Sequence, residues 1–151
     1  MAKKSAALKY YQSIGRRKSA TARIRLHLAT KEKEISFGDA KVKKGEIYVN
    51  GMQIDKYFSG QSDKVEYLTP LKLTDNLDRF AITIQVVGGG KAGQLDAIVL
   101  GLARALEKVD RAAYRPLLKK QGLLTRDARI RERRKVGMGG KARRKKQSPK
   151  R

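Results

Sequence analysis

Alternating apolar and polar residues predict strands in two parts of the chain. In residues 20–28 (ATARIRLHL) the apolar side chains fall on one face and the polar and basic ones on the other. Residues 80–87 (FAITIQVV) alternate in the same way, and residues 8–14 (LKYYQSI) are a weaker candidate. Because side chains of a strand point alternately to its two faces, each segment is expected to bury one face.

A hairpin is predicted over residues 47–54 (IYVNGMQI). Its centre is Asn50-Gly51, a pair that suits a two-residue turn in which both residues have positive φ. The preceding residues 30–45 are polar and mixed in charge, and most of this segment is expected to be a loop.

The helical pattern is strongest at residues 94–111, where apolar residues recur every three or four positions. Shorter helices are expected at residues 55–58 and 63–68, the second ended by Pro70. Pro116 is expected to start a last short helix, and Gly122 to end it.

Apolar residues become sparse after Thr125, so the end of the chain cannot bury enough surface to offset its conformational entropy. We therefore predict a globular α/β body over residues 1–122 and an extended basic arm over residues 123–151. The boundary lies somewhere within residues 115–128. Residues 129–151 are expected to be disordered in isolation.

Charge gives the chain its most unusual property. It carries 37 Lys and Arg against 14 Asp and Glu, a net charge of +23 and a pI near 10.6. Residues 115–151 hold 16 basic and two acidic residues, a balance of +14. Solubility needs far less charge, so a polyanionic partner is expected.

Several classes of protein are disfavoured by the composition. The chain has no Cys and one His, which leaves no disulfide, thiolate nucleophile or Cys/His zinc site. No apolar run approaches the roughly 18 residues of a membrane span, and the first residues lack an apolar signal core. His27 has no evident catalytic partner, so we expect a surface or packing histidine. A cytoplasmic protein without catalytic activity, metal or cofactor is predicted.

The stretch GGGKAG (88–93) satisfies the pattern GxGxxG between a strand and a helix. A dinucleotide site would also need a second parallel strand ending in an acidic residue, and a P-loop would need Ser or Thr after Lys91. Two interpretations stay open. The stretch is either a flexible turn or a place where backbone N–H groups and Lys91 meet a nucleic-acid phosphate.

Two basic clusters are candidates for RNA contact. The first contains Arg16, Arg17, Lys18, Arg23 and Arg25, with no acid among them. A solvated strand face is the alternative, but Arg on a rigid strand suits bidentate phosphate binding. The second cluster is the arm, which could extend on the order of 75 Å over about 23 residues. Its first cations are Arg126, Arg129, Arg131, Arg133, Arg134 and Lys135. A solvated terminus is the alternative there.

Three other functions share some of these features. A DNA-compacting protein would need a groove-reading helix or a dimer, and helix 94–111 presents few cations. A nucleotide-dependent enzyme would rest on GxGxxG alone. A membrane-surface protein would need an apolar face that the arm lacks.

Five segments together resemble the bacterial form of the family of the ninth small-subunit ribosomal protein. They are GRRKSATARIRL (15–26), IYVNG (47–51), DKYF (55–58), GGGKAGQLDAIVLGLARAL (88–106) and RPLLKKQGLLTRDARIRERRK (115–135), followed by a terminal KR. The chain departs from the family pattern at Val136 and in the terminal QSPKR.

The resemblance implies an α+β fold, the α/β sandwich named after the second domain of ribosomal protein S5, with a long basic C-terminal extension. It also implies a place in the head of the small subunit, without homo-oligomers. The expected partners are small-subunit rRNA, P-site tRNA and neighbouring head proteins. The rRNA-binding residues would be the first cluster, Lys91 and the arm up to Lys146, including Lys141, Arg143, Arg144 and Lys145. Lys150 and Arg151 would face the tRNA.

Overall fold

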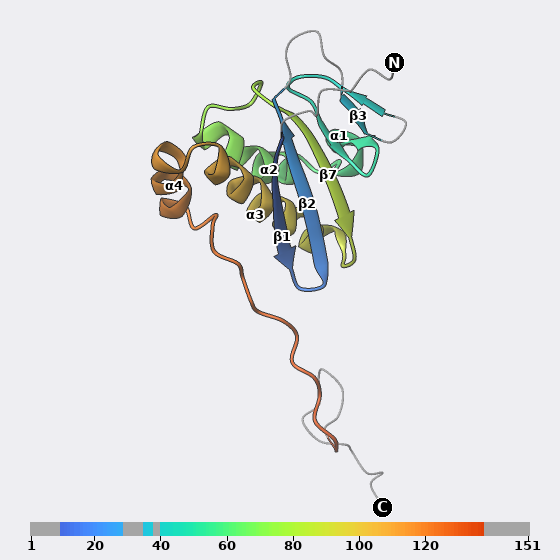
Figure 1. Cartoon of the computed structure of the whole chain (residues 1–151). Helices are drawn as coiled ribbons and strands as arrows, with labels where there is room; N and C mark the ends of the chain where they lie inside the picture. The colour runs from blue at the N-terminus through green and yellow to red at the C-terminus, as the bar shows by residue number, and fades with distance from the viewer. Residues whose placement is uncertain (1–9, 29–34, 38–39, 138–151) are drawn as a thin grey trace, which may run out of the picture.

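A computed structural model of the chain describes residues 10–28, 35–37 and 40–137 (Figure 1). One five-stranded sheet has the order β1-β2-β7-β5-β6, with β5 parallel to β7 and the other neighbouring pairs antiparallel. Its strands are β1 (Tyr10–Arg17), β2 (Ala20–His27), β5 (Ile47–Val49), β6 (Met52–Gln53) and β7 (Ala81–Val87). The helices are α1 (Ile54–Tyr57), α2 (Gln61–Leu73), α3 (Lys91–Val109) and α4 (Arg111–Lys120). The predicted α+β class is confirmed.

The predicted strands and hairpin are present. The strand expected at residues 8–14 continues to Arg17, and β2 ends at His27, which leaves Leu28 exposed. Asn50 and Gly51 have φ of 49° and 84° and connect β5 to β6. The Asn50 side chain also pairs with the backbone of Val86, with Nδ2–O and N–Oδ1 distances of 3.0 and 2.9 Å. This amide therefore extends the β5–β7 ladder past the end of β5.

The main core lies between the sheet and the helices, where α3 packs across β1 and β2. The approach is close because both surfaces carry small residues at the contact. A Cβ built on Gly15 would lie 1.9 Å from the Ala97 carbonyl oxygen, and one on Gly101 would lie 2.5 Å from Ile24 Cδ1. The Ser13 hydroxyl donates to the Gly101 carbonyl oxygen at 2.5 Å. Glycine at both positions allows the helix to rest on the strand backbone.

Part of the 30–45 segment is not a loop, so that expectation is wrong. Strands β3 (Ile35–Phe37) and β4 (Ala40–Val42) form a two-stranded sheet. Ile35 and Val42 bury a second, small core against Ala81, with Phe37 and Tyr48 at its margin. This core lies on the side of the main sheet that faces away from α3. The few apolar residues were too widely spaced to stand out in a polar segment, and only their contact with β7 makes them a core.

Several helix boundaries differ from the prediction: α2 begins at Gln61 rather than at residue 63, and α3 spans Lys91–Val109 rather than residues 94–111. The two largest differences each involve a proline. Helix α2 continues through Pro70 to Leu73, and α4 begins at Arg111 rather than at Pro116. Pro70 is buried beside Leu71 in the main core, and burial offsets the missing backbone hydrogen bond. Helix α4 begins early because the Asp110 side chain accepts from the N–H of Ala113 at 3.0 Å. The predicted end at Gly122 is confirmed by its φ of 71°.

Candidate nucleic-acid interface

Four of the five cations in the first basic cluster lie on the outer face of the sheet, opposite α3, or in the turn that joins β1 to β2. Arg16 and Arg23 are exposed on β1 and β2, and Lys18 lies in the turn between them with φ of 51°. Arg25 is held in place. Its Nε donates to Gln12 Oε1 at 3.1 Å, and its guanidinium lies 5.2 Å from the centre of the Tyr10 ring. Three of these cations thus lie on rigid strands, and Lys18 lies in the tight turn that joins them.

Exposed apolar side chains accompany these cations. Ile14 lies opposite Arg23 on β1, and Val87, which is 65% exposed, lies opposite Thr21 on β7. A surface that mixes cations with apolar groups can contact both the phosphates and the sugars of a nucleic acid.

Arg17 differs from the other cations of its cluster. It follows Arg16 in the strand, so its side chain lies on the inner side of the sheet, where it is only 14% exposed. Its Nε lies 3.1 Å from Asp96 Oδ2, and its Nη1 lies 3.0 Å from Asp127 Oδ1. The prediction that Arg17 contacts RNA remains untested, but within the free protein its guanidinium is already paired.

The Gly-rich stretch forms a tight turn against the β1–β2 turn and the first residue of β2. Gly88 and Gly89 have φ of 74° and 68°. A Cβ on Gly88 would lie 2.6 Å from the Ser19 carbonyl oxygen, and one on Gly89 would lie 2.8 Å from Ala20 Cβ. Packing and backbone conformation therefore account for these two glycines. Lys91 donates to the Tyr57 carbonyl oxygen at 3.3 Å, at the first turn of α3.

The dinucleotide interpretation finds no support in this topology. Within the described residues, α3 leads into α4 and not into a second parallel strand. A nucleotide fold of that type needs such a strand beside β7. Contact between Lys91 and a phosphate stays a prediction.

The groove-reading alternative is also weakened, because two cations of α3 are engaged within the protein. Arg104 Nη1 donates to the Ile14 carbonyl oxygen at 3.1 Å, and Lys108 Nζ donates to that of Gln12 at 2.7 Å. Both carbonyls lie on β1, at the edge of the sheet. These side chains cover a strand edge instead of facing a groove.

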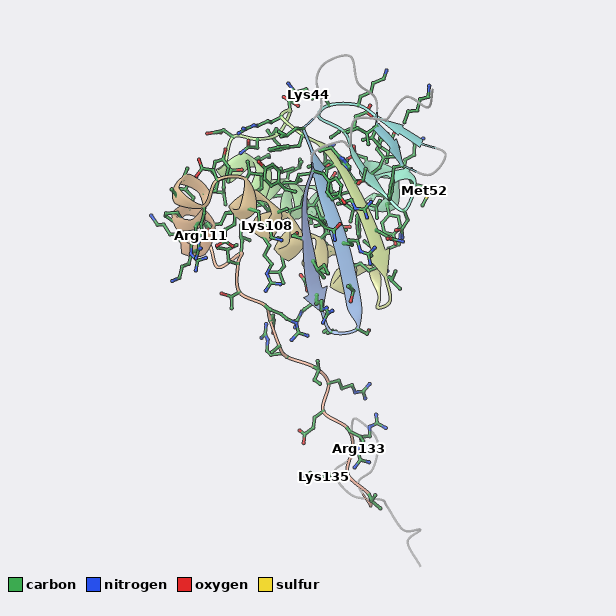
Figure 2. The ribbon with its side chains drawn as sticks, viewed as in Figure 1. Lys44, Met52, Lys108, Arg111, Arg133 and Lys135 are labelled. Atoms are coloured by element: carbon green, nitrogen blue, oxygen red, sulfur yellow. The ribbon has the colours of Figure 1, made fainter. Side chains whose placement is uncertain are left out.

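The segment after α4 carries the first cations of the arm. Residues 126–135 have no regular structure and extend away from the body, past the turn between β1 and β2 (Figure 1). Arg133 and Lys135 lie on this segment, well outside the layers of the body (Figure 2). All six predicted cations between Arg126 and Lys135 are exposed. Lys141, Arg143, Arg144, Lys145, Lys146, Lys150 and Arg151 lie outside the described residues.

Asp127 is the acidic residue at the start of this segment. Arg129 binds it with Nη2–Oδ2 and Nε–Oδ1 distances of 2.6 and 3.0 Å, and the Arg129 backbone N–H donates to Oδ1 at 2.9 Å. These hydrogen bonds, with the charges of Arg129 and Arg17, hold the pKa of Asp127 well below its usual range. The carboxylate is therefore ionised at neutral pH and can pair with both arginines.

The fold brings the three predicted stretches to one end of the sheet. We call this region, formed by residues 16–19, 88–91 and 126–129, the basic end of the sheet. Gly88 and Gly89 contact Ser19 and Ala20, and Arg17 contacts Asp127. A cleft of about 450 Å³ lies beside it, lined by both Arg16 and Arg17 and by Glu66, Asp96 and Asp127. Sequence reasoning missed Asp96 and Asp127, although an acid within LTRDAR was a signal for an internal ion pair.

No metal-binding cluster is found where the structure describes the chain. No three His, Asp or Glu side chains gather there to hold a metal ion. His27 is a packing histidine: it is 6% exposed, and its Nε2 lies 3.1 Å from Thr83 Oγ1. Burial, aided by the charge of Arg25, lowers its pKa. In the same part of the chain, no helix has the length and apolar content to cross a membrane.

Comparison with known proteins decides the family. Residues 15–151 match the sequence model of a family described as ribosomal protein S9/S16. The chain belongs to this family. The resemblance seen in the five sequence motifs is thereby confirmed, and the chain is a structural constituent of the ribosome and not an enzyme.

Two curated relatives are similar to this chain to the same extent. Both are named small ribosomal subunit protein uS9, from Anaeromyxobacter sp. strain K and from Anaeromyxobacter dehalogenans strain 2CP-1. Each is 39% identical over 134 residues, which cover 89% of this chain and 92% of the relative. The family match itself runs from residue 15 to residue 151, so it also includes the basic segment after α4.

Proposed function

We propose that this S9-family protein binds small-subunit rRNA with the outer face of its sheet and with its arm, and P-site tRNA with its last residues. The observation that carries the proposal is the run of exposed cations between Arg126 and Lys135, which has no regular structure and leaves the body. The finer fold assignment, an S5-second-domain-like sandwich over residues 1–122 with an arm from 123, belongs to the same proposal. So do head proteins as neighbours, the cytoplasmic location and the monomeric state.

The physical basis is the release of counterions from RNA phosphates. Each phosphate that Lys or Arg neutralises frees condensed counterions, which makes affinity high and dependent on salt. A segment without regular structure can thread into crowded RNA and order there, although ordering costs conformational entropy. Cations on β1 and β2 lose little freedom on binding because the strands already hold them. The two surfaces therefore suit different tasks: the arm reaches distant phosphates and the sheet fixes the register.

The first test is to follow the protein through sucrose gradients of cell lysate at low and moderate salt. Co-sedimentation with the small subunit at both salt concentrations is expected, because many phosphate contacts and a shaped site resist moderate screening. A control protein with similar net charge but no ribosomal role should be lost from the small-subunit fraction as the salt concentration rises. If this chain stays at the top of the gradient, or follows DNA and is lost with salt, the proposal is wrong.

A separate prediction concerns the tip of the arm. Replacing Lys150 and Arg151 with Ala should weaken P-site tRNA binding by about tenfold, because two charged contacts are removed. Assembly of the subunit should remain nearly unchanged, since the other arm cations are retained. The measurement is tRNA affinity of reconstituted subunits, with Lys145 and Lys146 replaced by Ala as the matched control. Lost assembly with unchanged tRNA affinity would refute the assignment of the tip.

A further inference from the structure

Arg17 makes contacts that a phosphate-binding arginine would not need. Its guanidinium joins three segments that are far apart in sequence: the end of β1, the start of α3 and the start of the arm. Besides the ion pairs with Asp96 and Asp127, its Nη1 lies 3.3 Å from the Asp127 carbonyl oxygen and 3.0 Å from that of Arg129. Four acceptors thus surround one guanidinium that is 14% exposed.

The arm has few other attachments. Leu123 and Leu124 pack against the main core, which ties the chain down just after α4. Between residues 126 and 137, every hydrogen bond or ion pair that the described part of the chain makes to the body involves Arg17. Ile130, the next residue after the last contact, is 71% exposed. The polar contacts between the body and the start of the arm therefore converge on Arg17.

The backbone of this segment explains why an arginine suits the position. Without a helix or strand, the carbonyl oxygens of residues 127 and 129 have no regular partners. A planar guanidinium presents several donors in a fixed fork, so one side chain can bind carboxylates and carbonyls together. Strand alternation turns Arg17 to the inner side of the sheet, where Asp96 of α3 and the arm meet it.

We propose that Arg17 is a positioning residue, which clamps the start of the arm against α3 through Asp96 and Asp127 and so aims the arm at its RNA site. The proposal rests on the proposed function of the arm as an rRNA ligand. It gives two adjacent arginines different tasks, Arg16 on the outer face and Arg17 inside. It also assigns a role to Asp127, an acid in a segment whose charge otherwise favours RNA. The arm's cations are held near those of the sheet, which raises their effective concentration at a shared RNA.

Removing a carboxylate separates this proposal from simple charge attraction, because the two predict opposite changes in the affinity for rRNA. Asp127→Asn removes a negative charge, so attraction to RNA alone would tighten binding. Loss of the clamp should instead weaken binding to small-subunit rRNA, by about three- to tenfold. Glu132→Gln is the matched control, since it makes the same charge change in the same exposed segment, where Glu132 has no described partner. It should bind rRNA as well as the unchanged protein or more tightly.

The orientation of the arm can be measured without RNA. The chain has no Cys, so Val65→Cys on α2 and Ile130→Cys on the arm introduce two spin-label sites that are 55% and 71% exposed. The distance distribution between the labels should broaden with Arg17→Gln and with Asp127→Asn. It should keep its width with Arg16→Gln and Glu132→Gln. Asp127→Asn keeps the test decisive if Arg17→Gln fails to fold.

The outcomes are distinct. An unchanged distribution in Asp127→Asn, or rRNA binding as tight as that of Glu132→Gln, overturns the clamp. Failure of the unchanged protein to bind small-subunit rRNA would instead overturn the proposed function, and the label distances alone would then decide whether Arg17 orients the arm.

Discussion

Removal of residues 126–151 is expected to weaken binding to small-subunit rRNA by about a thousandfold at about 0.15 M salt. The deleted segment holds 13 Lys and Arg and two acids. If half of those cations meet phosphates, the salt dependence of the affinity should also become much shallower, by about 0.7 to 0.9 in log–log slope for each lost contact. The measurement is a titration of rRNA with the truncated and full chains at several salt concentrations.

The control for this truncation separates charge from length. Replacing residues 126–151 with a Gly/Ser segment of equal length should lower the affinity for rRNA as much as the deletion does. An uncharged segment can extend as far, but it neutralises no phosphates and so releases no counterions. The melting temperature of both variants should stay close to that of the full chain, since residues 126–137 are exposed or nearly so. Full affinity in the truncated protein would show that the sheet face alone binds rRNA.

Gly15→Ala is expected to lower the free energy of unfolding by about 3 kcal/mol or more. The new Cβ would lie 1.9 Å from the Ala97 carbonyl oxygen and 2.6 Å from the Gly101 backbone nitrogen. Both neighbours are backbone atoms within α3, so relief requires the helix to move off β1. That movement would break the hydrogen bond from Ser13 to Gly101 and open the main core. Urea denaturation of the full chain measures the change.

Gly93→Ala, in the first turn of α3, is the control for this prediction, because it makes the same chemical change on the helix that Gly15 of β1 faces. Its Cβ would meet no atom closer than 3.7 Å, at the Arg17 carbonyl oxygen. Alanine is the better helix former, so stability should hold or rise by up to about 1 kcal/mol. Equal denaturation midpoints for Gly15→Ala and Gly93→Ala would show that α3 does not lie as close to β1 as described.

Local patterns in the sequence were enough for most elements. Strand alternation at residues 20–28 and 80–87, the Asn50-Gly51 turn and the periodicity of residues 94–111 each depend on near neighbours, and each is confirmed. The sequence-based predictions were wrong where a contact with a distant part of the chain outweighs the preference of the local residues. Pro70 lies inside α2 because the main core holds it, and Asp110 begins α4 one residue after α3 ends. Ile35 and Val42 form a core only because β7 passes beneath them.

Arg16 and Arg17 show the same difference, between what local sequence predicts and what distant contacts decide, within the candidate site. Composition and charge were enough to predict a polyanionic partner, and the five motifs were enough to identify the family, because net charge and residue order are properties of the sequence itself. Which cations remain free for that partner depends on the folded chain. Arg17, Arg104 and Lys108 are engaged inside the protein, since alternation on β1 and the packing of α3 bring acceptors from 79 to 112 residues away. Only the tertiary structure could bring such distant partners within hydrogen-bonding distance.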